Sequence, residues 1–184
     1  MEGLLLRARA GRLTAPWPRA ATLTARRLVL EPLRPDHARE LAPVLDDVAL
    51  HAFIGGAPGS ETELRARFTR QAAGQSPDGT QGWLNWVARD RATNAPVGTV
   101  QATISDGDDG RGAELAWVIA TGRQGEGLAT EAAGAAIDWL RDRGVTRFVA
   151  HIHPEHHASA AVARHLGLAA TDAWHEGEVR LVGS

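Results

Sequence analysis

The stretch "ATGRQGEGLATEAAGAAIDWL", from Ala120 to Leu140, changes from glycine-rich to alanine-rich within a few residues. It follows "AELAWVIA" (residues 113–120), an apolar run typical of a buried strand. Apolar residues from Leu128 to Leu140 form one helical stripe, and Gly144 ends the predicted helix. A glycine loop that leads from a strand into a helix exposes backbone N–H groups, which suits an anion such as phosphate. Glycine is also common in ordinary turns, so the loop alone leaves both interpretations open.

Length and composition indicate one globular domain. The chain has 184 residues, 43% of them hydrophobic, and a net charge of -2. These values allow a sizeable core and give no basic surface for nucleic acid. No apolar run is long enough to cross a membrane and no secretory signal is evident, so we expect a cytoplasmic protein. We expect residues 22–184 to form the domain and residues 1–21 to form an N-terminal arm, extended or disordered.

Three residue types are missing. The absence of cysteine excludes disulfides, thiolate metal ligands and a cysteine nucleophile. Tyrosine and lysine are also absent, and all 20 basic residues are arginine. This bias is typical of a GC-rich bacterial genome, so some substitutions can reflect mutational drift rather than new chemistry.

The remaining segments predict an α/β fold with a mixed sheet (α+β), in the order β-α-α-β-β-β-α-β-α-β-β. Apolar runs and apolar–polar alternation predict strands at residues 26–33, 82–90, 95–105, 113–120, 146–153, 168–174 and 177–182. Helices are expected at residues 35–43, 60–74, 128–143 and 157–167. Ser60 and Glu63 form a capping box at the start of the second helix.

Two common phosphate-binding motifs fit the glycine loop poorly. The dinucleotide fingerprint needs a third glycine or alanine in phase and an acidic residue after the next strand, and residues 146–153 end without one. A nucleotide P-loop needs a lysine, which the chain lacks.

Three segments instead resemble the GNAT superfamily of acyl-CoA-dependent N-acyltransferases. Its cofactor motif, Gln/Arg-x-x-Gly-x-Gly/Ala, corresponds to Gln124, Gly127 and Ala129. The later "HHASAAVARHLGL" resembles the family's Asn-x-x-Ser and Leu-Gly-Phe segment, with His156 in place of asparagine and Ser159 in register. The start, "LTARRLVLEPLRPDHARELAPVL", is similar to the branch of ribosomal-protein N-terminal (alanine/serine) acetyltransferases. The resemblance covers residues 22–184.

This resemblance implies two central strands that splay apart to admit the pantetheine arm of acetyl-CoA, while loop amides hold its pyrophosphate. A charged hydrogen bond from Arg123 could add to the phosphate site. The expected cofactor-binding residues are Val118, Ile119, Ala120, Arg123, Gln124, Gly125, Glu126, Gly127, Leu128, Ala129, Thr130, His156 and Ser159.

The resemblance makes Ser159 the candidate proton donor to the departing thiolate, because the tyrosine that many members use is absent. Ser159 could instead bond backbone N–H groups in the first turn of its helix. Glu114, at the head of its strand, is the candidate base, with a solvated carboxylate as the plain alternative. His151 and His153 are further base candidates, since they share one strand face and imidazole titrates near neutral pH. Glu176 and Glu178 are two more.

The sequence therefore predicts an acetyl-CoA-dependent N-acetyltransferase. Without cysteine, we expect direct attack by a primary amine in a ternary complex. The acceptor could be a protein N-terminus or a small amine. A catalytically weak CoA-binding sensor or interaction domain is the alternative function, and a dinucleotide-dependent oxidoreductase is a third hypothesis.

The histidine cluster "HIHPEHH" has the side chains for a zinc site, but no third ligand is firmly placed and we expect no metal. We expect no nucleic-acid or membrane partner, and a monomer or homodimer.

Overall fold

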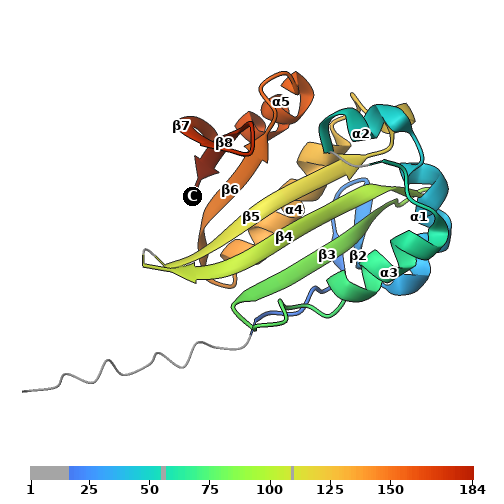
Figure 1. The fold of residues 1–184 in the computed structure, drawn as a ribbon, viewed down its shortest axis with the longest axis horizontal. Coiled ribbons are helices and arrows are strands. Elements are labelled where there is room, and N and C mark those ends of the chain that lie inside the picture. The colour runs from blue at the N-terminus through green and yellow to red at the C-terminus, as the bar shows by residue number, and fades with distance from the viewer. Residues whose placement is uncertain (1–16, 55–56, 109) are drawn as a thin grey trace, which may run out of the picture.

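A mixed sheet of eight strands forms the centre of the described structure, a computed structural model that describes residues 17–54, 57–108 and 110–184 (Figure 1). The strands are β1 (Leu23–Thr24), β2 (Leu28–Pro32), β3 (Gln81–Asp90), β4 (Pro96–Gly107), β5 (Gly110–Ile119), β6 (Val145–Ile152), β7 (Ala169–His175) and β8 (Glu178–Gly183). Their spatial order is β1-β2-β3-β4-β5-β6-β8-β7. Within it only β5 and β6 pair in parallel.

Helices cover both faces of this sheet. They are α1 (Ala38–Leu45), α2 (Val48–Ile54), α3 (Glu61–Gln71), α4 (Leu128–Arg141) and α5 (His157–His165), with 3-10 turns at Pro35–His37 and Thr121–Arg123. In Figure 1, α4 crosses one face of the sheet while α1 and α3 lie on the other. The predicted fold class and element order are confirmed. The structure adds β1 and α2, which are too short to leave a clear periodic pattern.

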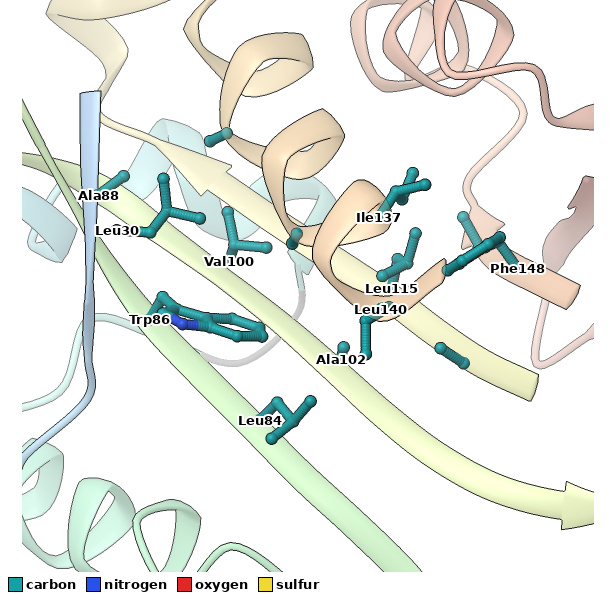
Figure 2. Close-up of a cluster of buried hydrophobic side chains, with 14 of the residues drawn as sticks. Leu30, Leu84, Trp86, Ala88, Val100, Ala102, Leu115, Ile137, Leu140 and Phe148 are labelled. Carbon is teal, nitrogen blue, oxygen red and sulfur yellow. The ribbon is translucent and has the colours of Figure 1, made fainter. Parts of the chain in front are cut away.

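The main core lies between α4 and the sheet. Alternate residues of β3, namely Leu84, Trp86 and Ala88, belong to the same core cluster as Ile137 and Leu140 of α4 (Figure 2). Val87, between two of these residues, belongs to the second core under α1 and α3. Because successive side chains of a strand point to opposite faces of the sheet, β3 contributes residues to both cores.

The N-terminal segment packs on the sheet before β1 begins. Trp17 lies against Gly82 and donates a hydrogen bond from Nε1 to the Gly79 carbonyl oxygen (2.9 Å). Trp86 Nε1 donates to the Ala21 carbonyl oxygen at the same distance. Residues 17–21 thus contact the domain, whereas residues 1–16 of the predicted arm lie outside the described residues.

The two central strands separate partway along their length. β5 pairs with β6 from Arg111 to Glu114, opposite Val145 to Val149. Beyond Glu114, β5 continues to Ile119 beside β4 alone, while β6 continues to Ile152 beside β8 alone. The expected splay is present, and it leaves one edge of the last half of β5 without a strand partner in the described structure.

Candidate functional site

The glycine loop between β5 and α4 presents a row of free backbone donors. The first helical hydrogen bond of α4 runs from the Glu131 amide to the Gly127 carbonyl oxygen. Within the described chain, the preceding amides from Gly125 to Thr130 have no hydrogen-bond acceptor. Gly125 and Gly127 have φ angles of +78° and +75°, a conformation that glycine adopts at low cost. These donors lie where the helix dipole adds positive potential, so the loop suits an anion.

Two side chains fix the shape of this loop. Gln124 donates a hydrogen bond from Nε2 to the carbonyl oxygen of Ile119 (3.0 Å), which ties the loop to the end of β5. Arg27 Nη1 donates to the carbonyl oxygen of Glu126 (2.9 Å) from the start of β2. Gln124 therefore contributes to the site by holding its backbone.

Arg123 is already paired with acidic side chains. Its guanidinium lies 2.8 Å from Glu126 Oε1 and 2.9 Å from Asp90 Oδ2. Hydrogen bonds to Glu126 and then to Asp90 raise the pKa of Arg123 further above its usual range. A phosphate contact by Arg123 has to share the guanidinium with these carboxylates, and that role stays a prediction.

A cavity of about 450 Å³, the loop-side cavity, lies between the glycine loop, α2 and α5. Most of the predicted cofactor residues line it: Val118, Ile119, Arg123, Gln124, Gly125, Gly127, Leu128, Ala129, Thr130, His156 and Ser159. Ala120 and Glu126 are not part of its lining. The Ala120 amide donates instead to the Val97 carbonyl oxygen (2.9 Å), so this donor is already used by β4.

A second cavity of about 380 Å³, the sheet-side cavity, lies over the open ends of β5 and β6 and extends toward α3. Glu114, His151, His153 and Glu178 are among its lining residues, whereas Glu176 is not. Both cavities are lined by Phe53, Trp117, Val118, His156 and Ser159. The two cavities therefore share a wall at the splay.

Glu114 and His151 come together on the neighbouring strands where the pairing ends. His151 Nδ1 lies 3.2 Å from Glu114 Oε1. The Glu114 side chain is 58% exposed and the His151 side chain 15%, so the pair reaches from the cavity wall to solvent. The ring of His175 lies 5.2 Å from that of His151. Two of the candidate bases thus form one hydrogen-bonded unit.

His156 and Ser159 mark the other side of the junction. The His156 ring stacks on Phe53 of α2, with centroids 4.3 Å apart and an interplanar angle of 19°. Burial, followed by the nearby charge of His153, lowers the pKa of His156. In the described structure the Ser159 hydroxyl makes no hydrogen bond, so the capping bond considered as its alternative role is not observed.

The sequence did not point to α2 or α3 as parts of the site. Phe53 reaches the junction from α2, and Arg67 and Gln71 line the sheet-side cavity from α3. The spacing of Arg67 and Gln71, four residues apart on one helix face, was the available signal. No group of three or more potential metal ligands occurs among the described residues. None of the helices described here is both long and apolar enough to span a membrane.

Residues 27–169 match the family described as the acetyltransferase (GNAT) domain. The chain belongs to the GNAT acetyltransferase family. This match covers most of the chain, including β5, the glycine loop, α4 and α5. Like the other members, the protein is therefore an acetyltransferase by family, and its fold agrees with that assignment.

Solved structures give the same fold. RimL, a ribosomal L7/L12 alpha-N-protein acetyltransferase solved with coenzyme A, is 17% identical with a TM-score of 0.72, over 89% of this chain and 97% of that chain. An acetyltransferase from Agrobacterium tumefaciens is 24% identical with a TM-score of 0.67, over 89% and 94%. The microcin C7 self immunity acetyltransferase MccE, solved with acetyl-CoA and AMP, is 16% identical with a TM-score of 0.70, over 85% and 92%. A comparison with curated proteins finds no match.

Proposed function

We propose that this GNAT protein transfers an acetyl group from acetyl-CoA to a primary amine. The observation that carries the proposal is the wall shared by two cavities at the splay of β5 and β6, one cavity beside free backbone donors and the other beside an acid–base pair. A thioester entering from one side and an amine entering from the other would meet at the shared wall.

The loop-side cavity supplies the contacts that a CoA molecule requires. Amides from Gly125 to Thr130 would bind the pyrophosphate, and the free edge of β5 near Val118 and Ile119 would pair with the pantetheine arm. A backbone donor near the thioester oxygen would stabilise the negative charge that develops there. RimL and MccE were solved with CoA and acetyl-CoA, which supports the same use of this cavity.

The sheet-side cavity supplies the proton transfers. Glu114 and His151 would accept a proton from the amine, directly or through water, so that its lone pair can attack the acetyl carbonyl. The carbon–sulfur bond breaks as the carbon–nitrogen bond forms, and the Ser159 hydroxyl would donate a proton to the departing thiolate. Direct attack in a ternary complex fits a chain without cysteine.

Thiol release from acetyl-CoA, measured with a panel of amines, tests this proposal. We expect turnover with at least one class of amine, and a fall in kcat of about 100-fold for Glu114→Gln and for Ser159→Ala. Glu176→Gln is the matched control, because Glu176 does not line either cavity, and it should keep full activity. Equal activity in all four proteins would remove Glu114 and Ser159 from the mechanism.

The second candidate is a CoA-binding sensor with little turnover. The chain has no tyrosine, and His156 stands where the family pattern has asparagine. This candidate gives tight CoA binding by calorimetry without thiol release for any amine. Thiol release above the rate of acetyl-CoA hydrolysis eliminates it.

A further inference from the structure

The sheet-side cavity contains an arginine that forms no ion pair with any carboxylate among the described residues. Arg67 lines this cavity from α3 and is the only arginine among its described lining residues. Other arginines near the sheet are paired: Arg89, for example, binds Glu31 and Glu40. In the parts of the chain that the structure describes, no carboxylate pairs with Arg67. Its guanidinium carbon lies 5.6 Å from the centre of the Phe68 ring.

The position of Arg67 on α3 is unusual for a solvated arginine. Leu64 and Phe68 are buried beneath the same helix, and residues three or four apart share a helix face. Arg67 therefore lies beside the buried stripe, directed toward the sheet side of α3 rather than fully away from it. The residue as a whole is exposed, yet protein atoms around its charged end, with the charge of Arg70, lower the pKa of Arg67. It stays cationic at neutral pH.

The polar side chains near Arg67 on the cavity wall form their hydrogen bonds with other groups and not with its guanidinium. Gln71 Nε2 donates to Gln101 Oε1 (3.4 Å), and Asn85 Nδ2 donates to the Gln71 carbonyl oxygen (3.4 Å). The two carboxylates that line the cavity, Glu114 and Glu178, belong to β5 and β8 rather than to α3. The cavity thus has an unpaired cation on its helical wall and carboxylates on its strand wall.

We infer that the acceptor is an amine that carries an anionic group, a carboxylate or a phosphate, and that Arg67 binds this group. The amine end faces Glu114 and His151, while the anionic end forms charge-assisted hydrogen bonds with the guanidinium. This inference rests on the proposed function and adds the substrate class. Arg67 is a specificity residue that contacts the substrate away from the reacting atoms.

The test compares acceptors that differ only in the anionic group. Suitable pairs are free amino acids against their primary amides, peptide amides beginning Ser-Asp against Ser-Asn, and phosphoethanolamine against ethanolamine. We expect the anionic member of at least one pair to have a kcat/KM about tenfold higher or more. The pair that shows the difference distinguishes a free amino acid, a peptide and a phosphorylated amine.

Two substitutions on α3 assign the preference to one residue. Arg67→Gln should abolish it by raising KM about tenfold with little change in kcat, since Arg67 acts on binding. Arg70→Gln removes the same charge from the same helix but from a residue outside the cavity lining, and should keep the preference. Equal loss in both variants, or equal rates for both members of every pair in the parent protein, overturns the inference.

A binding measurement separates this inference from the proposed function. Calorimetry of the CoA-bound protein with N-acetylaspartate and with N-acetylasparagine amide needs no turnover. We expect tighter binding of N-acetylaspartate, weakened about tenfold by Arg67→Gln and unchanged by Arg70→Gln. Turnover without any preference for anionic acceptors contradicts the inference about Arg67 but leaves the proposed function in place. Binding that depends on Arg67, without turnover of any amine, contradicts the proposed function but leaves the inference in place.

Discussion

Gly125 and Gly122 lie three residues apart in one loop but differ in backbone conformation. Gly125 has a φ of +78°, whereas Gly122 does not have a positive φ, and neither has an atom within 4 Å of a built Cβ. A methyl group meets open space at both positions. The two alanine variants therefore differ in the backbone strain that they introduce, because only Gly125 has a positive φ.

We expect Gly125→Ala to lower the free energy of unfolding by about 1 kcal/mol, because a non-glycine residue is strained at this φ. Its affinity for CoA should also fall about tenfold, since relief of the strain turns the free amides away from one another. Gly122→Ala is the control and should lower neither property, since alanine fits its backbone conformation without strain. Urea unfolding and calorimetry measure them, and equal behaviour of the two variants would contradict the role given to the loop backbone.

Single residues of the site differed in how well the sequence foretold them. Glu114 and His151 were separate candidates because each has suitable chemistry, but only the end of strand pairing brings them within 3.2 Å. Phe53 and Arg67 were not singled out, since a phenylalanine or an arginine on a helix has many ordinary roles. The positions of these two residues in the site depend on contacts between segments distant in the sequence, which a local pattern does not show.

At the scale of elements, α4 is attached to the start of β2 by one carboxylate. Glu131 Oε2 accepts from Arg27 Nε (2.7 Å), and Glu131 Oε1 accepts from the Arg27 amide. Burial acts to raise the pKa of Glu131, but the hydrogen bonds from Arg27 outweigh it and lower this pKa. The attachment holds the first turn of α4, and with it the free amides, against the sheet.

Glu131→Ala should reduce the free energy of unfolding by about 2 kcal/mol near neutral pH, because it leaves the Arg27 donors without their acceptor. A lowered folded-state pKa means that this stabilisation is present above the ordinary value of 4.5 and is lost as pH falls through the folded-state pKa. The difference between the parent and variant should therefore shrink on acidification. Urea unfolding at several pH values measures it.

Asp138→Ala gives the matched control on α4. The Asp138 side chain is 79% exposed and its pair with Arg141 is long (3.4 Å), so its loss should be close to neutral at every pH. If Asp138→Ala lowered the free energy of unfolding as much as Glu131→Ala does, the loss of any carboxylate on α4 would explain the effect, and the contact with Arg27 would not be needed.

Elements with a clear periodic pattern were predictable, and the two elements that the sequence did not indicate are short. The stripe from Leu128 to Leu140 fixed α4, and the capping box of Ser60 and Glu63 is present at α3. β1 has two residues and α2 has seven, so neither completes enough periods to stand out. Their formation depends on packing against β2 and on the second core, which a local pattern does not contain.

At the scale of the whole molecule, CoA should protect the protein from heat. A ligand that binds only the folded state at 100 times its Kd stabilises by about 2.7 kcal/mol. For a chain of this length the melting temperature should rise by roughly 5–10 °C. Scanning calorimetry with CoA measures this shift, and NAD is the control because it carries a pyrophosphate without pantetheine. An equal shift with NAD would favour the dinucleotide alternative.

The row of amides from Gly125 to Thr130 has an evolutionary consequence. Any amino acid except proline brings the same N–H group, so replacements outside Gly125 and Gly127 keep the donors that we propose for the ligand, provided that the backbone path is kept. Related sequences can diverge widely while this row of backbone donors is kept. Homologues that share it can therefore differ in almost every other respect, including the molecule that they modify.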